Sequence, residues 1–243
     1  MLLAIDVGNT QIKLAVFEQN TLLKKIIIPY SDWKKETQKL LIFFPEITNI
    51  AVATVGKLQK EDFFGLKDGV EISFITHESK FPFLNQYATP NTLGIDRMVL
   101  ASGAVLQFPN QNRLVIDLGT CVTYDFIDDN DVYHGGAISP GIHLRYESLH
   151  NYTAKLPLLS LEFPKAVLGN STEQSIHSGV INGITFEIEG FISSILDKND
   201  NFIIILTGGD AEFLAERLKN TIFANSNFLL ESLNQTYQYN NND

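Results

Sequence analysis

The sequence has few of the features that stabilise or anchor a chain without an ordinary globular core. One cysteine among 243 residues excludes an intrachain disulfide, so we expect a reducing compartment, with the cytoplasm as the default. We find no run of about 20 apolar residues and therefore expect no membrane-spanning segment. Lys and Arg number 18 against 28 Asp and Glu, and the formal charge of −10 argues against a nucleic-acid or anionic-membrane surface.

Two common nucleotide-binding motifs are also missing. The chain contains neither G-x-x-x-x-G-K-[ST] nor G-x-G-x-x-G, so a P-loop or a Rossmann site has no support. Its five histidines do not show the spacing of metal ligands. The composition, 44% apolar and 19% charged, is typical of a globular protein with one or two domains.

One short pattern is present twice, about half the chain apart. Leu3–Thr10 and Leu114–Cys121 each consist of an apolar strand that ends in Asp-x-Gly and a small polar residue. Each is followed by a second stretch with strand character, Ile12–Phe17 and Val122–Ile127. A strand–turn–strand unit with an acidic residue at the turn can hold a metal–phosphate complex. Two such units facing each other can hold a nucleotide between them.

The order of predicted elements repeats in the same way. Strands are predicted at Leu2–Val7, Gln11–Phe17, Leu22–Ile28, Ile50–Thr54, Val70–Ile75, Leu114–Asp117, Val122–Ile127, Val132–Ile138 and Phe202–Thr207. Helices are predicted at Trp33–Phe44, Gln59–Gly65, Leu93–Leu106 with Thr92 as N-cap, Gly141–Tyr152, Thr172–Leu196 and Ala211–Leu218, with a short strand and helix in Phe228–Tyr239. We therefore expect an α/β fold of two domains, 1–112 and 113–243, each a mixed sheet with helices.

The first Asp-x-Gly turn carries the clearest chemistry. Gly8 permits a tight turn that brings backbone amides close to an anion, and Asn9 and Thr10 add side-chain donors. Lys13, on the following strand, could reach a phosphate. Asp6 cannot bind a phosphate directly and suits Mg²⁺ or its waters. Taken alone, the motif could be an ordinary Asp-Gly hairpin turn, but the second copy at Asp117 favours a ligand site.

The second turn has the same pattern. Thr120 could donate to a phosphate oxygen, and Asp117 could bind a cation. Cys121 has apolar neighbours and no adjacent basic residue, so a packed, inert thiol is expected. Gly208-Gly209, after the last apolar strand, would let a flat ring or a ribose approach the backbone, although a plain strand-to-helix turn explains it equally well.

Two further glycine-containing motifs mark helix starts. Gly94-Ile95-Asp96-Arg97 opens a helix, where the helix dipole favours an Asp for structural reasons alone. Arg97 beside it suggests a polar site. The segment from Gly135 to Gly141 is a second glycine-rich turn before a helix and a candidate site for an anion or an oxygen ligand.

In this order and spacing, the motifs resemble type III pantothenate kinase, a family of the acetate and sugar kinase/actin superfamily. The motifs are Asp6-x-Gly8-Asn9-Thr10-x-x-Lys13, Gly94-x-Asp96-Arg97, Asp117-x-Gly119-Thr120-x-x-Thr123-x-Asp125, Gly135-Gly136-x-Ile138-x-Pro140-Gly141 and Gly169-x-Ser171-Thr172. Each is weak singly, but five in order over essentially the whole chain are a strong signal. Cys121 stands where the family usually has Ala, a small-for-small difference.

The resemblance implies two ribonuclease H-like, actin-like domains that face a central nucleotide cleft. It implies transfer of the ATP γ-phosphoryl group to the primary hydroxyl of pantothenate, by a homodimer that uses Mg²⁺ and a monovalent cation, K⁺ or NH₄⁺. Asp96 would be the general base, Asp117 would hold the monovalent cation, and Asp6 would hold Mg²⁺ through the ATP phosphates. ATP would be bound by Asp6, Val7, Gly8, Asn9, Thr10, Gln11, Ile12, Lys13 and Thr120. Pantothenate would be bound by Tyr87, Gly94, Ile95, Asp96, Arg97 and Thr172, the last of which can reach in from the neighbouring subunit.

Two other functions fit the same superfamily. A non-catalytic actin-like accessory module would be expected to lose Asp6, Asp96 or Asp117, and all three are present. Another phosphoryl enzyme, such as a sugar kinase or a polyphosphate phosphatase, would generally be longer and lack the Gly94–Arg97 motif in this context. Partners are therefore expected to be pantothenate, ATP and a second copy of the chain, without nucleic acid or membrane.

Overall fold

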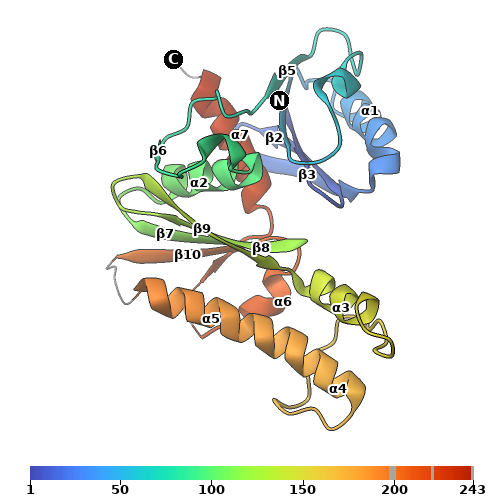
Figure 1. Cartoon of the computed structure of the whole chain (residues 1–243). Coiled ribbons are helices and arrows are strands. Elements are labelled where there is room, and N and C mark those ends of the chain that lie inside the picture. Colours follow the sequence, from blue (N-terminus) through green and yellow to red (C-terminus); the bar gives the residue numbers. More distant parts are fainter. Residues whose placement is uncertain (197–200, 220–221, 242–243) are drawn as a thin grey trace. The chain divides into compact units, whose positions relative to one another are not determined.

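The computed structural model describes residues 1–196, 201–219 and 222–241. The chain divides into two compact units, each described below by itself (Figure 1). Unit 1 comprises Met1–Asn110, Ile127–Gly135 and Asn227–Asp243, and unit 2 comprises Gln111–Phe126 and Gly136–Ser226. The division of the sequence into domains 1–112 and 113–243 stays a prediction.

A five-stranded mixed sheet forms the centre of unit 1, in the order β3-β2-β1-β4-β5. Its strands are β1 (Leu2–Val7), β2 (Ile12–Glu18), β3 (Thr21–Ile28), β4 (Asn49–Thr54) and β5 (Glu71–Phe74). β1 is antiparallel to β2 and parallel to β4. Leu3, Ile5 and Val7 point into a core cluster that includes residues of the following helix. Asp6 therefore points to the opposite face, since side chains alternate along a strand.

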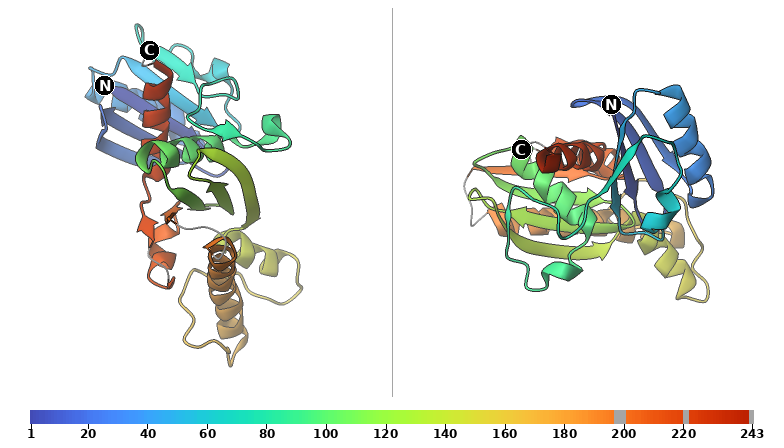
Figure 2. Two further views of the ribbon diagram at one scale, coloured as in Figure 1. Left: turned by 90° about the vertical axis from the view of Figure 1, so that its left-hand side faces the viewer. Right: turned by 90° about the horizontal axis from the view of Figure 1, so that it is seen from above.

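Helices cover this sheet on both faces. The helices of unit 1 are α1 (Trp33–Phe43), α2 (Ile95–Gln107) and α7 (Phe228–Asn241), with 3₁₀ turns η1 (Tyr30–Asp32), η2 (Lys60–Phe63) and η3 (Pro90–Thr92). α2 and α7 lie side by side (Figure 2), and the Thr236 hydroxyl donates to Ser102 Oγ at 2.8 Å. Gly103 permits this close approach, because a methyl group there would collide with Ser232.

The second sheet repeats the strand order of the first. Its order is β11-β10-β7-β8-β9-β6, so β9-β8-β7-β10-β11 corresponds to β3-β2-β1-β4-β5. The strands are β7 (Asn112–Leu118), β8 (Cys121–Ile127), β9 (Val132–Pro140), β10 (Phe202–Thr207), β11 (Phe223–Ala224) and β6 (Leu84–Asn85). β6 pairs in parallel with the first residues of β9, and this pairing lies within unit 1. The internal repeat predicted from the two Asp-x-Gly segments is thus confirmed by the topology.

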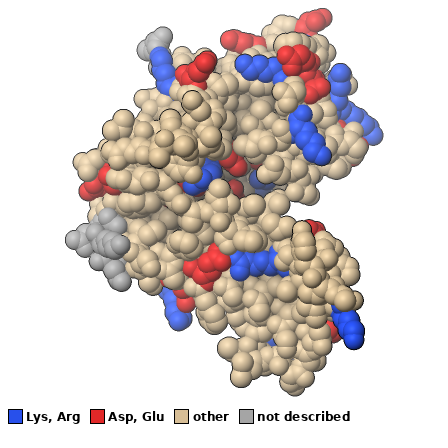
Figure 3. Space-filling model, viewed as in Figure 1, with Lys and Arg blue, Asp and Glu red and all other residues tan. Residues whose placement is uncertain are grey.

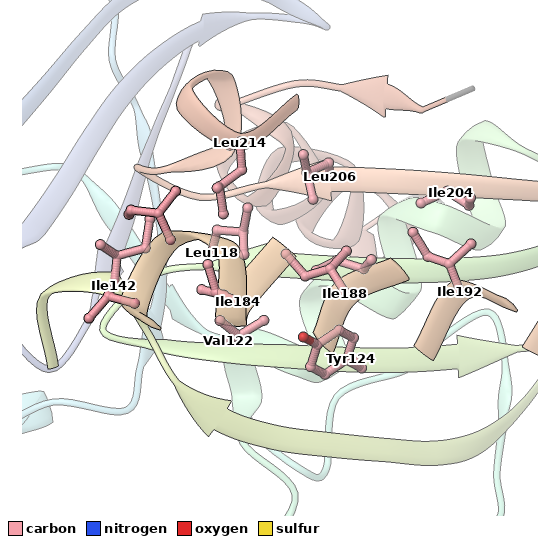
Figure 4. Close-up of a cluster of buried hydrophobic side chains, with 14 of the residues drawn as sticks. Leu118, Val122, Tyr124, Ile142, Ile184, Ile188, Ile192, Ile204, Leu206 and Leu214 are labelled. Atoms are coloured by element: carbon pink, nitrogen blue, oxygen red, sulfur yellow. The ribbon is translucent and has the colours of Figure 1, made fainter. Parts of the chain in front are cut away.

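Unit 2 packs one long helical segment against its sheet. Its helices are α3 (Ile142–Asn151), α4 (Thr172–His177), α5 (Gly183–Leu196) and α6 (Ala211–Ala215), and a π-helical turn, η4 (Ser178–Asn182), joins α4 to α5. In Figure 4, Ile184 and Ile188 of α5 point toward Val122 and Tyr124 of the sheet. By length and composition alone, Thr172–Leu196 could cross a membrane, but its apolar residues form this core.

Most predicted elements are confirmed, and several details are wrong. The helix predicted at Gln59–Gly65 is a 3₁₀ turn over Lys60–Phe63, and the two-residue strand β11 (Phe223–Ala224) has no counterpart in the prediction. Phe228–Tyr239 contains no strand; α7 runs without interruption from Phe228 to Asn241. The N-cap of α2 is Gly94, because Thr92 ends the preceding 3₁₀ turn. The region before that turn, for which the sequence predicts neither a strand nor a helix, contains the two-residue strand β6; its pairing with β9 is a long-range contact that local composition does not encode. Figure 3 shows acidic and basic side chains intermixed on the visible face.

Candidate active site

The Asp6–Lys13 pair lies at the end of β1. Asp6 and Lys13 are register partners across β1 and β2, and Lys13 Nζ lies 3.2 Å from Asp6 Oδ2. The Asp6 side chain is only 3% exposed, whereas that of Lys13 is 27% exposed. Lys13 can therefore present part of its charge to a ligand while Asp6 holds its position.

Two hydrogen bonds hold the backbone of the turn after Asp6, and the tip of the turn is exposed. The Gly8 amide donates to the Gln11 carbonyl at 3.2 Å, and the Tyr30 hydroxyl donates to the Gly8 carbonyl. Asn9 and Thr10 are exposed at the tip. The side chains of Val7 and Ile12 are fully buried, so only their backbone groups could contact ATP.

Asp96 occupies the first turn of α2. The Arg97 amide donates to Asp96 Oδ1 at 2.8 Å, which satisfies one of the amides left unpaired at a helix start. Gly94 precedes the helix, and a methyl group there would collide with Asp96 Oδ1. Gly94 therefore leaves room for the carboxylate, which is half-buried and retains a second oxygen for a ligand.

The Asp96 carboxylate acts electrostatically on Asp6 within unit 1. Burial raises the pKa of Asp6 above its usual range; Lys13 opposes this rise, and the Asp96 carboxylate adds to it. The Asp96 carboxylate thus makes the negative form of Asp6 less favourable in this site. A bound cation favours that negative form, because it relieves the repulsion between the two carboxylates.

Tyr87 and Arg97 form the other side of this region. The Arg97 guanidinium lies 5.8 Å from the centre of the Tyr87 ring, a cation–π distance, and Arg97 is 95% removed from solvent. Gly135, at φ +112°, lies beneath the ring; a methyl group there would be 3.4 Å from it. Tyr87, Arg97 and Gly135 come from three separate segments, which tertiary structure alone brings together.

Asp117 is the next-to-last residue of β7 in unit 2, as Asp6 is of β1 in the first sheet. It is half-buried, and its register partner is Thr207 of β10. Gly208 follows at φ +98°, and a side chain there would collide with both Asp117 Oδ1 and the Leu118 carbonyl. Two oxygens thus lie close to Gly208, and one of them, the Leu118 carbonyl, accepts a hydrogen bond from the Asp210 amide at 3.2 Å.

Thr120 is exposed at the turn between β7 and β8. The Gly119 amide donates to the Cys121 carbonyl at 3.0 Å, and the Gly141 amide donates to the Thr120 carbonyl at 3.0 Å. Hydrogen bonds therefore hold the backbone of this turn on both sides of Thr120, which is itself exposed. Cys121 is half-buried and begins β8.

Thr172 lies apart from the other predicted residues of unit 2. It is the first residue of α4. Ser171, the residue before it, is the N-cap, and its hydroxyl accepts a hydrogen bond from the Gln174 amide at 3.2 Å. Thr172 lines a cavity of about 630 Å³ that also involves Gly169 and Ile176. None of the other predicted site residues lines this cavity, so the role of Thr172 in binding pantothenate stays a prediction.

Comparison with known proteins decides which of the open functional classes applies. Residues 2–194 match the family model described as type III pantothenate kinase. The chain belongs to the type III pantothenate kinase family. A relative in this family, from Flavobacterium psychrophilum, is 63% identical over 239 residues, which cover 98% of this chain and 99% of the relative.

Solved structures show the fold. A Campylobacter jejuni protein, described as a candidate Baf family transcriptional activator, superposes with a TM-score of 0.65 at 21% identity, covering 99% of this chain and 100% of its own. A glucokinase from an Antarctic psychrotroph superposes with a TM-score of 0.53 at 12% identity and covers 98% of both chains. The sequence identities are too low to infer an activity. The superpositions confirm the mixed α/β fold of actin-like kinases.

For a type III pantothenate kinase, the arrangement of acidic residues bears on how a magnesium ion could be held. Among the described residues, no group of three or more His, Cys, Asp or Glu side chains is placed to hold a metal ion. A magnesium ion held by one carboxylate and by substrate phosphates needs no such cage. Asp6, buried and close to a second negative charge, fits that arrangement.

Sequence reasoning missed two groups near the second turn. Asp210 follows Gly209; burial raises its pKa, and His143, 3.9 Å away, opposes this rise. Glu187 of α5 and Arg145 of α3 form an ion pair at 2.6 Å. Asp210 could have been found from the neighbouring Gly-Gly, but nothing local in the sequence marks Glu187.

Proposed function

We propose that this chain transfers the γ-phosphoryl group of ATP to the primary hydroxyl of pantothenate. The product is 4'-phosphopantothenate, and the reaction is the first step of coenzyme A synthesis. Family membership supports this activity, and one structural observation supports the mechanism most directly. The Asp96 carboxylate, at the start of α2, acts electrostatically on Asp6, beside the turn predicted to bind phosphate.

We assign the phosphates of ATP to the first turn and to Thr120. Asn9 and Thr10 are exposed at the tip of this turn, and Lys13 supplies a positive charge that Asp6 holds in place. Phosphoryl transfer depends mainly on positioning and charge neutralisation. Together with Gly8 and Gln11, these residues form a rigid anion-binding turn rather than a source of covalent catalysis.

We assign pantothenate to the region around Tyr87, Gly94 and Arg97. The pantothenate carboxylate would pair with Arg97, whose planar guanidinium suits bidentate binding and is already held against the Tyr87 ring. Ile95 is buried and would contribute through its backbone. In this arrangement the acceptor hydroxyl lies at Asp96.

Asp96 then acts as the general base. As the hydroxyl oxygen forms its bond to the γ-phosphorus, its O–H bond breaks and the proton passes to an Asp96 carboxylate oxygen. The bond between the γ-phosphorus and the bridging oxygen breaks, and its electron pair leaves with ADP. The oxygen that accepts the Arg97 amide fixes the carboxylate, so the other oxygen is the one available for the proton.

We propose that Asp6 holds Mg²⁺ through the ATP phosphates and that Asp117, with the Leu118 carbonyl, holds K⁺ or NH₄⁺. When bound, these cations would neutralise phosphate charge. The oxygens at Gly208 and the negative charge around Asp6 support the assignment. The family also leads us to propose a homodimer, with Thr172 reaching the neighbouring subunit's substrate, in the cytoplasm. Light scattering on the purified chain tests the homodimer.

The decisive experiment is a kinase assay with ATP, Mg²⁺, K⁺ and pantothenate, read by direct mass-spectrometric detection of phosphopantothenate. Glucose and N-acetylmannosamine serve as competing acceptors, because actin-like folds include sugar kinases. Turnover with pantothenate alone is expected. Preference for a sugar, or ATP binding without turnover on any acceptor, would contradict the proposal and favour one of the two alternative functions.

A further inference from the structure

The Glu187 carboxylate collects donors from three different elements of unit 2. The Tyr124 hydroxyl of β8 donates to Oε1 at 2.8 Å. Arg145 of α3 donates to Oε2 at 2.6 Å, and the Ser139 hydroxyl of β9 donates to the same oxygen at 3.1 Å. Both oxygens of one carboxylate on α5 are therefore occupied by side chains that come from β8, β9 and α3.

The charges in this cluster are matched. Burial by itself would raise the pKa of Glu187, but the hydrogen bonds from Arg145, Tyr124 and Ser139 outweigh it and hold the pKa below its usual range. Burial and the Glu187 carboxylate together raise the pKa of Tyr124. At neutral pH the carboxylate is therefore ionised and the tyrosine is protonated, so each hydrogen bond keeps its direction.

Arg145 connects this cluster to the turn that carries Thr120. Its Nε donates to the Pro140 carbonyl at 2.8 Å, and its backbone amide donates to the Gly141 carbonyl at 3.0 Å. The Gly141 amide in turn donates to the Thr120 carbonyl at 3.0 Å. Arg145 thus holds segment 139–141 by hydrogen bonds, and the same segment lies against the turn that carries Thr120.

The contact between Gly141 and the turn is close. A methyl group at Gly141 would collide with the carbonyls of both Gly119 and Thr120. A small displacement of segment 139–141 would therefore be transmitted directly to the backbone of the turn, since packed groups move together. The Tyr124 hydrogen bond ties Glu187 to the strand on the other side of the turn, because β8 begins at the residue after Thr120.

We propose that Glu187 is a positioning residue for Thr120: through Arg145 and the 139–141 segment, it fixes the turn that presents the Thr120 hydroxyl to the ATP phosphates. The inference rests on the proposed function, because Thr120 is a phosphate ligand there. It adds a residue on a distant helix, with no place in any of the sequence motifs, that controls the affinity for ATP and leaves the pantothenate side unaffected.

The test is Glu187→Gln, with Glu189→Gln as the matched control on the same helix. Glu189 is also paired with a basic residue, Lys219 at 3.6 Å, and within the part of the chain that the structure describes its hydrogen bond and ion pair both go to Lys219, not to segment 139–141. Glu187→Gln is expected to weaken ATP binding by about five-fold or more, and to raise the KM for ATP equally, with the KM for pantothenate unchanged. Glu189→Gln is expected to leave both KM values unchanged.

A double-mutant cycle identifies the route. If Glu187 acts through Arg145, the double variant Arg145→Gln/Glu187→Gln should bind ATP no more weakly than the worse single variant. Additive losses would show that Arg145 does not transmit the effect. Should Glu187→Gln fail to fold, Ser139→Ala and Arg145→Gln test the same chain of contacts, with thermal unfolding recorded for each variant.

Calorimetric titration with ATP separates this inference from the proposed activity. If the wild type binds ATP but makes no phosphopantothenate, the proposed function fails and the positioning role is still measured. Equal ATP affinity in Glu187→Gln and Glu189→Gln, or a parallel rise in the KM for ATP and for pantothenate, would overturn the positioning role. Failure of the wild type to bind ATP would overturn it as well.

Discussion

Asp6 and Lys13 face each other across the first two strands, and their side chains meet at 3.2 Å. The pair joins a buried carboxylate to a partly exposed ammonium group, and burial outweighs the lysine in setting the pKa of Asp6. The first turn therefore keeps a carboxylate in a place that disfavours its charge. A group retained at such a cost to stability points to a role in ligand binding.

Asp6→Asn is expected to abolish most activity without weakening the fold. Because the folded-state pKa of Asp6 is raised, its protonated form is favoured, and stability from this group is lost as pH rises through that pKa. Removal of the charge should therefore leave the free energy of unfolding at pH 7 unchanged or higher, while kcat/KM falls by about 100-fold or more. Urea unfolding and steady-state kinetics measure the two effects. A loss of more than about 2 kcal/mol would show that the ion pair stabilises the fold.

Asp96→Asn should lower kcat by about 100-fold or more and preserve the structure, because the amide oxygen can still accept the Arg97 amide but cannot take a proton. Asp32→Asn is the control; Asp32 likewise lies at the start of a helix, as the N-cap of α1, but makes no side-chain capping bond. Steady-state rates and circular dichroism are compared. Near-normal kcat in Asp96→Asn would remove Asp96 as the base.

Gly135→Ala should raise the KM for pantothenate and leave the KM for ATP unchanged. The added methyl group would meet the Tyr87 ring at 3.4 Å, at a backbone angle, φ +112°, that side chains disfavour. Gly190→Ala is the control, since a methyl group at Gly190 meets no atom within 4 Å. Equal kinetics in both variants would show that Tyr87 does not position pantothenate.

Replacement of K⁺ by Na⁺ should slow the reaction, and Asp117→Asn should remove this difference. The smaller ion fits less well where the Asp117 carboxylate and the Leu118 carbonyl lie close to Gly208. Product must be detected directly, because coupling enzymes can have cation requirements of their own. Equal rates of the wild type in K⁺ and Na⁺ would argue against a cation at Asp117.

Glu187 should also give the fold a measurable acid sensitivity. Since its folded-state pKa is lowered, its stabilising contribution is present above the unfolded pKa, near 4.5, and is lost as pH falls through the folded-state value. Urea unfolding at pH 7 and pH 4 should show a smaller drop in stability for Glu187→Gln than for the wild type. The same drop in both proteins would show that Arg145 and Tyr124 do not stabilise the ionised form.

The element pattern could be predicted where short-range chemistry dictates it. Short apolar runs bounded by turn residues identify β1 and β2, and Gly8 and Gly119 identify the turns that follow β1 and β7. Prediction was wrong at the start of α7, where Phe228–Leu230 resemble a strand locally but belong to a helix packed beside α2. Tertiary packing overrides local propensity at such a position.

The sequence by itself determined the repeated Asp-x-Gly turns, their strands and the family, because these depend on residues that are close together in the chain. Only the tertiary structure decided that Asp96 acts on Asp6, that Gly135 supports Tyr87 and that Glu187 holds Arg145, 42 residues away. These relationships arise when strand pairing and helix packing bring distant segments together. Spacing along the chain carries no record of such contacts, since many registers and packings share the same local pattern.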